Sequence, residues 1–252
     1  MGKVFLFSQN QNYLIGVDNK NRIKSWNKSS FNNYSNINEF NKTIKSIALL
    51  ENNLLAIASC DMNGIEIWDV KNQSKSFDLN DHTDCVNTVI SLNFFDQTFL
   101  ISGSADTTIR LYDSYFKNIQ TIQENSDPVL TLEYNPQNKL IASNSKSNKI
   151  KIWSFSYNMN ERKKAHDNGI NTICVLGNGL IATGSQDAKA KIWKINNDNS
   201  LKLVSTLERL SDWVNSLILL KNKSLVSGSF LDGIKVWIQK NEYNFKCVAT
   251  LN

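Results

Sequence analysis

The chain has 252 residues, of which 41% are hydrophobic and 20% are charged. This composition is typical of a globular protein with enough apolar residues to form a buried core. The longest apolar runs, such as residues 217–220, are far shorter than a membrane span, and residues 1–9 lack the apolar stretch of a secretory signal. The sequence therefore argues against a membrane-spanning protein. We expect a cytoplasmic location, with nuclear and cytoskeletal locations left open.

The charge balance does not favour nucleic-acid binding. The formal net charge is +5, from 28 basic and 23 acidic residues. The longest block of like charge is the short run Arg162-Lys163-Lys164, which a solvated surface explains better than a nucleic-acid site.

The cysteines do not form a recognisable site. Cys60, Cys85, Cys174 and Cys247 lie far apart, no CxxC pair is present, and the chain has only two histidines. We predict four free thiols in a reducing compartment, and no metal site.

The chain repeats itself from beginning to end. Residues 100–113 (LISGSADTTIRLYD), 180–194 (LIATGSQDAKAKIWK) and 225–238 (LVSGSFLDGIKVWI) share one pattern. An aromatic residue marks each copy at intervals of 40 to 44 residues: Trp26, Trp68, Tyr112, Trp153, Trp193 and Trp237. A period of this length indicates stacked supersecondary units. It divides the chain into six units of approximately residues 1–43, 44–84, 85–127, 128–168, 169–212 and 213–252.

Each unit has the periodicity of short β-strands. The first unit opens on a predicted strand at residues 4–7. Four runs rich in β-branched and aromatic residues follow one another in the third unit, at 86–94, 99–104, 108–113 and 119–124. The fifth unit repeats them at 170–176, 180–185, 190–195 and 201–207, and the sixth ends on a predicted strand at 245–251. We expect four antiparallel strands in each unit.

The repeated motif resembles that of the WD-repeat (WD40-type) family. It combines Ser-Gly-Ser or Thr-Gly-Ser, an Asp in the following turn, an apolar–basic alternation, and Trp-Asp, here Trp68-Asp69 with Tyr112-Asp113 as a close variant. The resemblance covers the whole chain. It implies an all-β fold, a β-propeller of six four-stranded antiparallel blades around a central channel, in a single domain over residues 1–252. Closure with a seventh blade or by a partner remains an alternative.

The resemblance also implies a buried polar network that joins a His, a Ser or Thr, an Asp and the marker aromatic. Two units have the complete set: His82, Ser102, Asp106 and Tyr112, and His166, Thr183, Asp187 and Trp193. In the sixth unit the His and Asp positions are Leu210 and Leu231. Ser227 and Trp237 remain at the other two positions of this unit. The first, second and fourth units also lack the set, and we expect these three to rely on packing alone.

In a propeller, the loops before each first strand and the turns between second and third strands form one face, at the mouth of the channel. The family commonly binds partners there. The candidate partner-binding residues at these positions are Lys3, Thr43, Cys85, Lys146, Gln186, Trp213 and Phe230. Trp213 and Phe230 belong to one unit, and an exposed aromatic pair is the composition of an interface hot spot. The alternative is that Trp213 folds over its own blade and caps it.

No catalytic motif is present. The chain has no G-x-G-x-x-G, no Walker-type lysine and no G-x-S-x-G elbow, and both histidines fall in the implied networks. Gly103, Gly184 and Gly228 recur at one position, which indicates a backbone requirement and not a phosphate cradle.

We therefore expect no cofactor and no enzyme activity. The expected function is that of a scaffold or adaptor for protein or peptide partners. Two alternatives are a basic propeller that docks on RNA or a ribonucleoprotein, and the recognition module of a longer kinase or ubiquitin-ligase-type regulatory protein. The oligomeric state stays open.

Overall fold

The structure is a computed structural model. It describes residues 4–9, 13–18, 20–29, 34–39, 42–61, 64–94, 97–123, 127–136, 139–145, 149–154, 159–196, 200–207, 210–229, 231–241 and 244–251. Apart from one 3-10 turn, Glu51–Asn53, all regular structure among these residues is β-strand. The chain divides into two compact units, Met1–Val129 and Leu130–Asn252.

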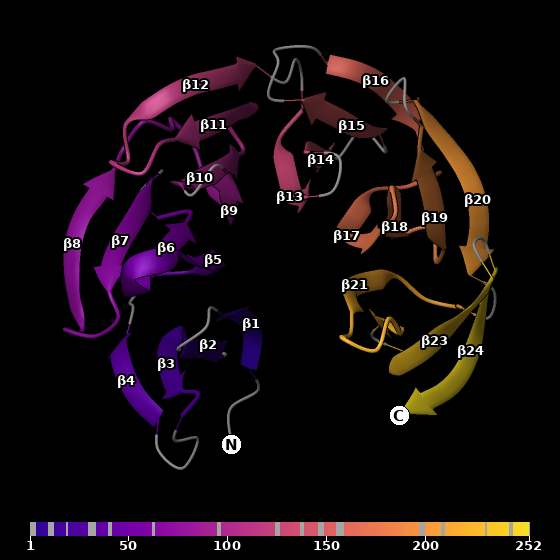
Figure 1. Cartoon of the computed structure of the whole chain (residues 1–252), viewed down its shortest axis with the longest axis horizontal. Coiled ribbons are helices and arrows are strands. Elements are labelled where there is room, and N and C mark those ends of the chain that lie inside the picture. The colour runs from indigo at the N-terminus through magenta and orange to yellow at the C-terminus, as the bar shows by residue number, and fades with distance from the viewer. Residues whose placement is uncertain are drawn as a thin grey trace. The chain divides into compact units, whose positions relative to one another are not determined.

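The first unit holds three four-stranded antiparallel sheets (Figure 1). Blade one consists of β1 (Val4–Gln9), β2 (Tyr13–Asp18), β3 (Arg22–Asn27) and β4 (Tyr34–Glu39). Blade two consists of β5 (Ile44–Leu49), β6 (Leu54–Ser59), β7 (Ile65–Asp69) and β8 (Ser74–Leu79). Blade three consists of β9 (Val86–Phe94), β10 (Gln97–Ser104), β11 (Thr108–Tyr112) and β12 (Asn118–Gln123).

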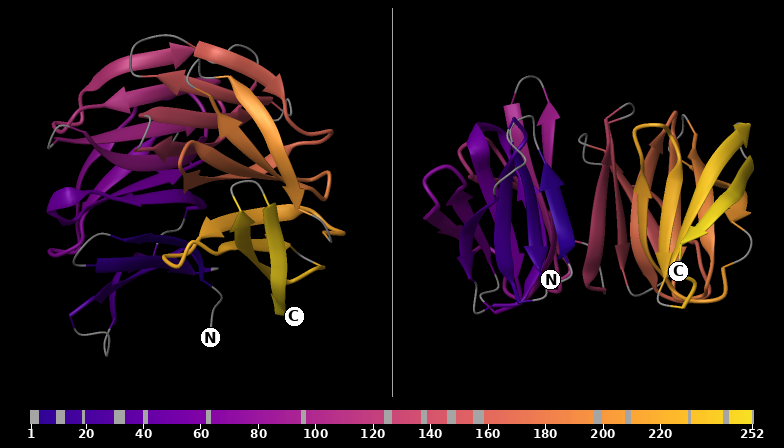
Figure 2. Two further views of the ribbon diagram at one scale, coloured as in Figure 1. Left: turned by 45° about the vertical axis from the view of Figure 1, so that its right-hand side comes forward. Right: turned by 90° about the horizontal axis from the view of Figure 1, so that it is seen from below.

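The second unit repeats this arrangement. Blade four consists of β13 (Val129–Asn135), β14 (Leu140–Ser145), β15 (Lys149–Ser154) and β16 (Met159–Lys164). Blade five consists of β17 (Ile170–Gly177), β18 (Leu180–Ser185), β19 (Ala190–Ile195) and β20 (Leu201–Leu207). Blade six consists of β21 (Val214–Leu219), β22 (Leu225–Ser229), β23 (Ile234–Asn241) and β24 (Asn244–Leu251). In every blade, strands that follow one another in sequence also pair, as Figures 1 and 2 show. The prediction of six four-stranded antiparallel blades is confirmed.

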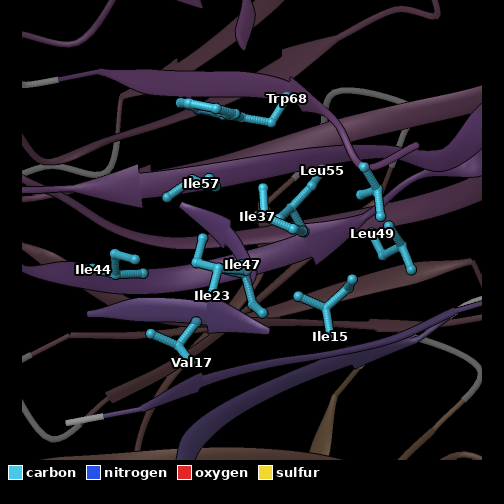
Figure 3. Packing of buried hydrophobic residues seen from close by; sticks show 11 residues of the cluster. Ile15, Val17, Ile23, Ile37, Ile44, Ile47, Leu49, Leu55, Ile57 and Trp68 are labelled. Atoms are coloured by element: carbon cyan, nitrogen blue, oxygen red, sulfur yellow. The ribbon is translucent and has the colours of Figure 1, made fainter. Parts of the chain in front are cut away.

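The core consists of apolar layers between adjacent blades of the same unit. Blades one and two enclose a cluster that includes Ile15, Ile23, Ile47, Leu55 and Trp68, all less than a tenth exposed. Figure 3 shows these side chains together between the strands of the two sheets. Burial of one such aliphatic side chain contributes about 1.5–3 kcal/mol, so the layers between blades supply most of the stability.

Burial differs between inner and outer strands for a simple reason. All six residues of β14 and of β18 are buried. For β18, the reason is that the sheets of blades four and six, in the same unit, cover its two faces. By contrast, β12 alternates between intermediate and exposed positions, as expected of a strand with one face in water. The apolar and small residues of β18 therefore follow from burial on both faces.

The recurring glycine of the second strand marks a close approach between blades. A Cβ on Gly184 would lie 2.5 Å from Val214 Cγ1, on the first strand of blade six, and 2.8 Å from Thr172 Cγ2. A Cβ on Gly103 would lie 2.9 Å from Thr88 Cγ2, on the first strand of its own blade. Only a residue without a side chain fits here, as the interpretation of a backbone requirement anticipates.

We expect Gly184→Ala to lower the free energy of unfolding by about 1–2 kcal/mol, because the new methyl group must push blades five and six apart. Urea denaturation measures the effect. Gly169→Ala is the matched control, since its Cβ would meet only the flexible Gln186 side chain, at 3.4 Å. If both variants unfold at the same urea concentration, the glycine does not set the spacing between these blades.

Candidate functional site

The fifth blade holds a continuous buried polar network. His166 Nδ1 lies 2.9 Å from Asp187 Oδ2, and His166 Nε2 lies 2.8 Å from Thr183 Oγ1. The indole N–H of Trp193 donates to the same Thr183 Oγ1 over 2.9 Å. Burial lowers the pKa of His166, although the Asp187 carboxylate opposes this effect. The network is thus satisfied by a neutral imidazole that donates from Nδ1 and accepts at Nε2.

The third blade repeats the network up to its last member. His82 Nδ1 lies 2.8 Å from Asp106 Oδ2, and His82 Nε2 lies 2.7 Å from Ser102 Oγ. Burial acts to raise the pKa of Asp106, but hydrogen bonds from Thr108 and His82 hold it at about 2. The predicted fourth member, Tyr112, is fully buried, and its hydroxyl makes no hydrogen bond to any described residue. The phenol carries its polar atom at the tip of the ring, whereas the indole N–H of Trp193 lies on the side that faces Thr183.

The expectation that blades one, two and four rely on packing alone is wrong for blades two and four. Blade six forms the bond between the two network positions that remain there. Trp153 donates to Ser143 Oγ over 2.8 Å, and Trp237 donates to Ser227 Oγ over 2.9 Å. In blade two the indole of Trp68 donates instead to Glu66 Oε2 over 2.8 Å. A buried N–H left without a partner would cost about 1–3 kcal/mol, and each blade avoids this cost with the acceptor nearest to its indole.

Blade two needs the glutamate because Ile57 occupies the strand position that carries the hydroxyl in blades three to six. Ile57 pairs with Glu66 across β6 and β7, as Thr183 pairs with Lys191 in blade five. Glu66 is only 7% exposed, and Lys42 Nζ lies 2.8 Å from its other carboxylate oxygen. The carboxylate is therefore both hydrogen-bonded and paired, which buried charges require.

The prediction that blade six lacks its aspartate is also wrong. Asp232 accepts hydrogen bonds from the backbone N–H and the hydroxyl of Ser211, each over 2.7 Å, and pairs with Lys235 Nζ at 2.9 Å. The hydrogen bonds from Ser211 and the contact with Lys235 hold the pKa of Asp232 well below its usual value.

The aspartate stands one position later in blade six than in blades three and five because its turn has a different conformation. In blades three and five the Asp directly precedes a residue with positive φ, Thr107 at 69° and Ala188 at 60°. In blade six the left-handed residue is Gly233, at 66°, one position later in a turn of equal length. Asp232-Gly233 is a strong turn signal, and it could have identified the aspartate from sequence.

The predicted partner-binding residues have different environments. Trp213 is 52% exposed. Thr43 is exposed, and its N–H donates to Asp61 Oδ2 over 2.7 Å. Gln186 is half-buried and donates to Asn171 Oδ1 over 3.1 Å. Lys3, Lys146 and Phe230 lie outside the described residues, so the Trp213–Phe230 pair stays a prediction.

The seventh candidate is Cys85, and here the prediction of four free thiols is wrong. Its sulfur is bonded to that of Cys60 in a disulfide, whereas Cys174 and Cys247 are free. Cys60 directly follows β6 and Cys85 directly precedes β9. These two positions are 25 residues apart in sequence but belong to loops of adjacent blades, so only the folded chain brings them together.

The structure adds residues that the sequence analysis missed. Leu231, released from the Asp position, is 75% exposed, and its N–H donates to Asp212 Oδ2 over 2.8 Å, next to Trp213. A chain of amide groups runs from the turn between β18 and β19 in blade five to the first strand of blade six. Gln186 donates to Asn171, and Asn171 Nδ2 donates in turn to Asn215 Oδ1 over 3.1 Å and to the carbonyl of Val214 over 3.2 Å.

Trp213 directly precedes β21 and Asn215 is the second residue of that strand, so both lie at the same end of blade six. The mouth site, as we name it, consists of Trp213, Leu231, Asn215, Asn171 and Gln186. The asparagines were detectable, since Asn87, Asn171 and Asn215 each follow the first residue of a first strand. Neither histidine contributes, because both are closed within their networks.

Among the described residues, no three His, Cys, Asp or Glu side chains lie close enough together to hold a metal ion. In the same part of the chain, no helix has the length and apolar composition to cross a membrane.

Comparison with known proteins gives a consistent result. The family model described as "WD domain, G-beta repeat" matches residues 73–113, 116–154 and 160–194. The chain is similar to Nuclear distribution protein PAC1 of Candida albicans, with 23% identity over 116 residues, 44% of this chain and 24% of that protein. It is similar to Polyadenylation factor subunit 2 of the same organism, with 26% identity over 137 residues, 54% of this chain and 25% of that protein.

A third relative is Poly(A)+ RNA export protein of Schizosaccharomyces pombe, with 25% identity over 132 residues, 49% of this chain and 38% of that protein. The chain thus matches between about a quarter and two fifths of the length of these relatives. Among solved structures, a chain in the "Crystal Structure of Mitotic Checkpoint Complex" superposes with a TM-score of 0.82 at 22% identity. The match covers 100% of this chain and 78% of that chain. This likeness establishes the fold.

Proposed function

Because the chain is a WD-repeat β-propeller protein, we propose that it is a non-catalytic scaffold that binds protein partners or peptides at the mouth site. The observation that carries this proposal is the exposure of Trp213. Half of its surface is open to water. Leu231, whose N–H donates to Asp212, the residue before Trp213, is three-quarters exposed. Large apolar side chains in contact with water, next to a polar rim, are typical of interface hot spots.

A purely structural role for Trp213 is less well supported. The equivalent residue, just before the first strand, is Gly169 in blade five and Cys85 in blade three, and both blades form without an aromatic ring there. The aromatic residues that hold blades together behave differently, since Trp193 and Trp237 are each only 2% exposed. The ring of Trp213 is therefore available to a partner.

The amide chain suits an extended protein segment. Side-chain amides offer both donors and acceptors without charge, and the backbone of an extended peptide needs both. Trp213 and Leu231 would then hold an apolar side chain of that segment. The similar proteins have names from nuclear distribution, polyadenylation and RNA export. This variety supports a shared role in binding over a shared reaction.

We expect Trp213→Ala combined with Leu231→Ser to weaken partner binding about thirtyfold, the equivalent of a hot-spot loss of about 2 kcal/mol. Quantitative affinity capture with mass spectrometry from the native cell measures this loss. Leu203→Ala is the matched control, because Leu203 is also large, apolar and 43% exposed, but lies on the outer strand β20.

Both proteins should melt at nearly the same temperature as the wild type. Identical partners for the double variant and the control would contradict the proposal. Partners that disappear after ribonuclease treatment would favour RNA docking in its place.

A further inference from the structure

A second surface, on blades two and three, is not used by the mouth site. A cavity of about 160 Å³ lies where β5 leads into β6, near the start of β10 and the turn after β11. Its apolar walls are Leu50, Leu54 and Phe116, and its polar walls include Glu51, Thr98 and Ser114. All of these residues belong to the first compact unit. The cavity lies at the opposite end of the strands from the turn between β10 and β11.

The turn beside the cavity is held in one conformation. Asp113 Oδ1 accepts hydrogen bonds from the N–H groups of Tyr115 and Lys117, each over 2.9 Å. Phe116 has a φ of 62°, which a bulky residue adopts only when its surroundings enforce it. The ring of Phe116 packs edge-to-face on Phe77, with 4.9 Å between the ring centres. Tyr115, on the same turn, is 88% exposed. Because the turn is held in one conformation, a partner would meet a preorganised surface.

One carboxylate sets the charge of the cavity. Glu51 is the only charged residue among the described residues that line it. Asn93 Nδ2 donates to Glu51 Oε1 over 2.7 Å, and Thr98 Oγ1 donates to Asn93 Oδ1 over 3.1 Å. These two bonds fix the carboxylate at the cavity. Its second oxygen makes no hydrogen bond within the described part of the chain.

We propose that this cavity binds the side chain of an arginine from a protein partner. The guanidinium group is planar, pairs with carboxylates and stacks on aromatic rings, so Glu51 and Phe116 complement it from two sides. The hydroxyls of Thr98 and Ser114 accept its remaining N–H groups. Exposed Tyr115 packs against the neighbouring residues of the partner. Lys117, exposed on the same turn, repels a run of basic residues and so favours a single arginine in an otherwise uncharged segment.

The test compares N-acetyl-arginine amide with N-acetyl-citrulline amide, which has nearly the same shape without the charge. Each is titrated into the full ¹⁵N-labelled chain, and the backbone amide signals are followed by NMR. We expect the arginine probe to shift the signals of Thr98, Ser114 and Phe116 in a saturable way, with citrulline binding about tenfold more weakly or worse.

Glu51→Gln keeps the acceptor for Asn93 and removes the charge, so it should abolish the preference for arginine. Asp84→Asn, an exposed carboxylate before β9, is the matched control and should leave the preference unchanged. Equal binding of the two probes, shifts confined to other parts of the chain, or an undiminished preference in Glu51→Gln would each overturn the proposal. The result is independent of the mouth site, because no residue is shared.

Discussion

Trp193→Ala is expected to lower the free energy of unfolding by about 3–5 kcal/mol, the usual cost of deleting a large buried aromatic side chain. The ring is 2% exposed and packs in the cluster that joins blades four and five, with Ile152, Ile170 and Ile181. Its N–H also donates to Thr183. The substitution therefore leaves a cavity between two blades and removes one hydrogen bond from the buried network.

Trp213→Ala is the internal comparison, because the same residue type is lost from an exposed position. We expect a change of about 0.5 kcal/mol or less, as for other surface substitutions. Urea denaturation of the two variants, with fluorescence and circular dichroism as probes, gives both values. Equal losses of stability would contradict the division between structural and partner-facing tryptophans on which the mouth site depends.

The strands were predictable because each depends on residues close together in sequence. The pattern from Leu180 to Lys194 determines a strand, a turn and a second strand without reference to any distant residue, and it recurs in register. The same holds for the network in blade five, where His166, Thr183 and Asp187 lie within one repeat. Patterns of this kind, which involve only residues of one repeat, can be recognised from a single sequence.

The errors arose where a contact depends on the folded backbone. Asp232 was missed because the repeats were aligned without a gap, which places Leu231 at the aspartate position. In the structure the aspartate is instead the residue directly before the one with positive φ, here Gly233. Glu66 was missed because its role depends on the side chain across the pair, Ile57. The bond between Cys60 and Cys85 joins two different repeats. The repeat pattern describes the residues within one unit and does not predict contacts between neighbouring units, so it could not reveal this bond.

Glu133 is expected to make the stability of the protein depend on pH near neutrality. It lies four residues into the first strand of blade four, where blades two and five have the buried residues Ala48 and Cys174. Burial raises the pKa of Glu133 to about 7, while a hydrogen bond from the backbone of Tyr134 opposes the shift. The thiol of Cys174 has a pKa raised to about 12, by burial and by the nearby Glu133 carboxylate. An ionisable side chain thus occupies a position that blades two and five fill with small uncharged ones.

The sign of the effect follows from linkage. The ordinary pKa of 4.5 applies to the unfolded chain, so between pH 4.5 and 7 the unfolded state releases its proton while the folded state retains it. Stability therefore falls as the pH rises through this window, and the loss above pH 7 is about 3 kcal/mol. Glu133→Gln mimics the protonated form. It should match the wild type at pH 4.5 and exceed its free energy of unfolding by about 3 kcal/mol at pH 8.

Urea denaturation of both proteins at pH 4.5, 6, 7 and 8 gives this difference directly. Subtracting the two curves removes the contributions of His82 and His166. Burial lowers the pKa of both histidines, so the stability that they contribute is lost as the pH falls below 6.5, the opposite direction. Glu51→Gln makes the same chemical change at an exposed position and should follow the wild type throughout. A difference between Glu133→Gln and the wild type that does not change with pH would show that the folded and unfolded states bind the proton of this carboxyl group equally, and would overturn the prediction.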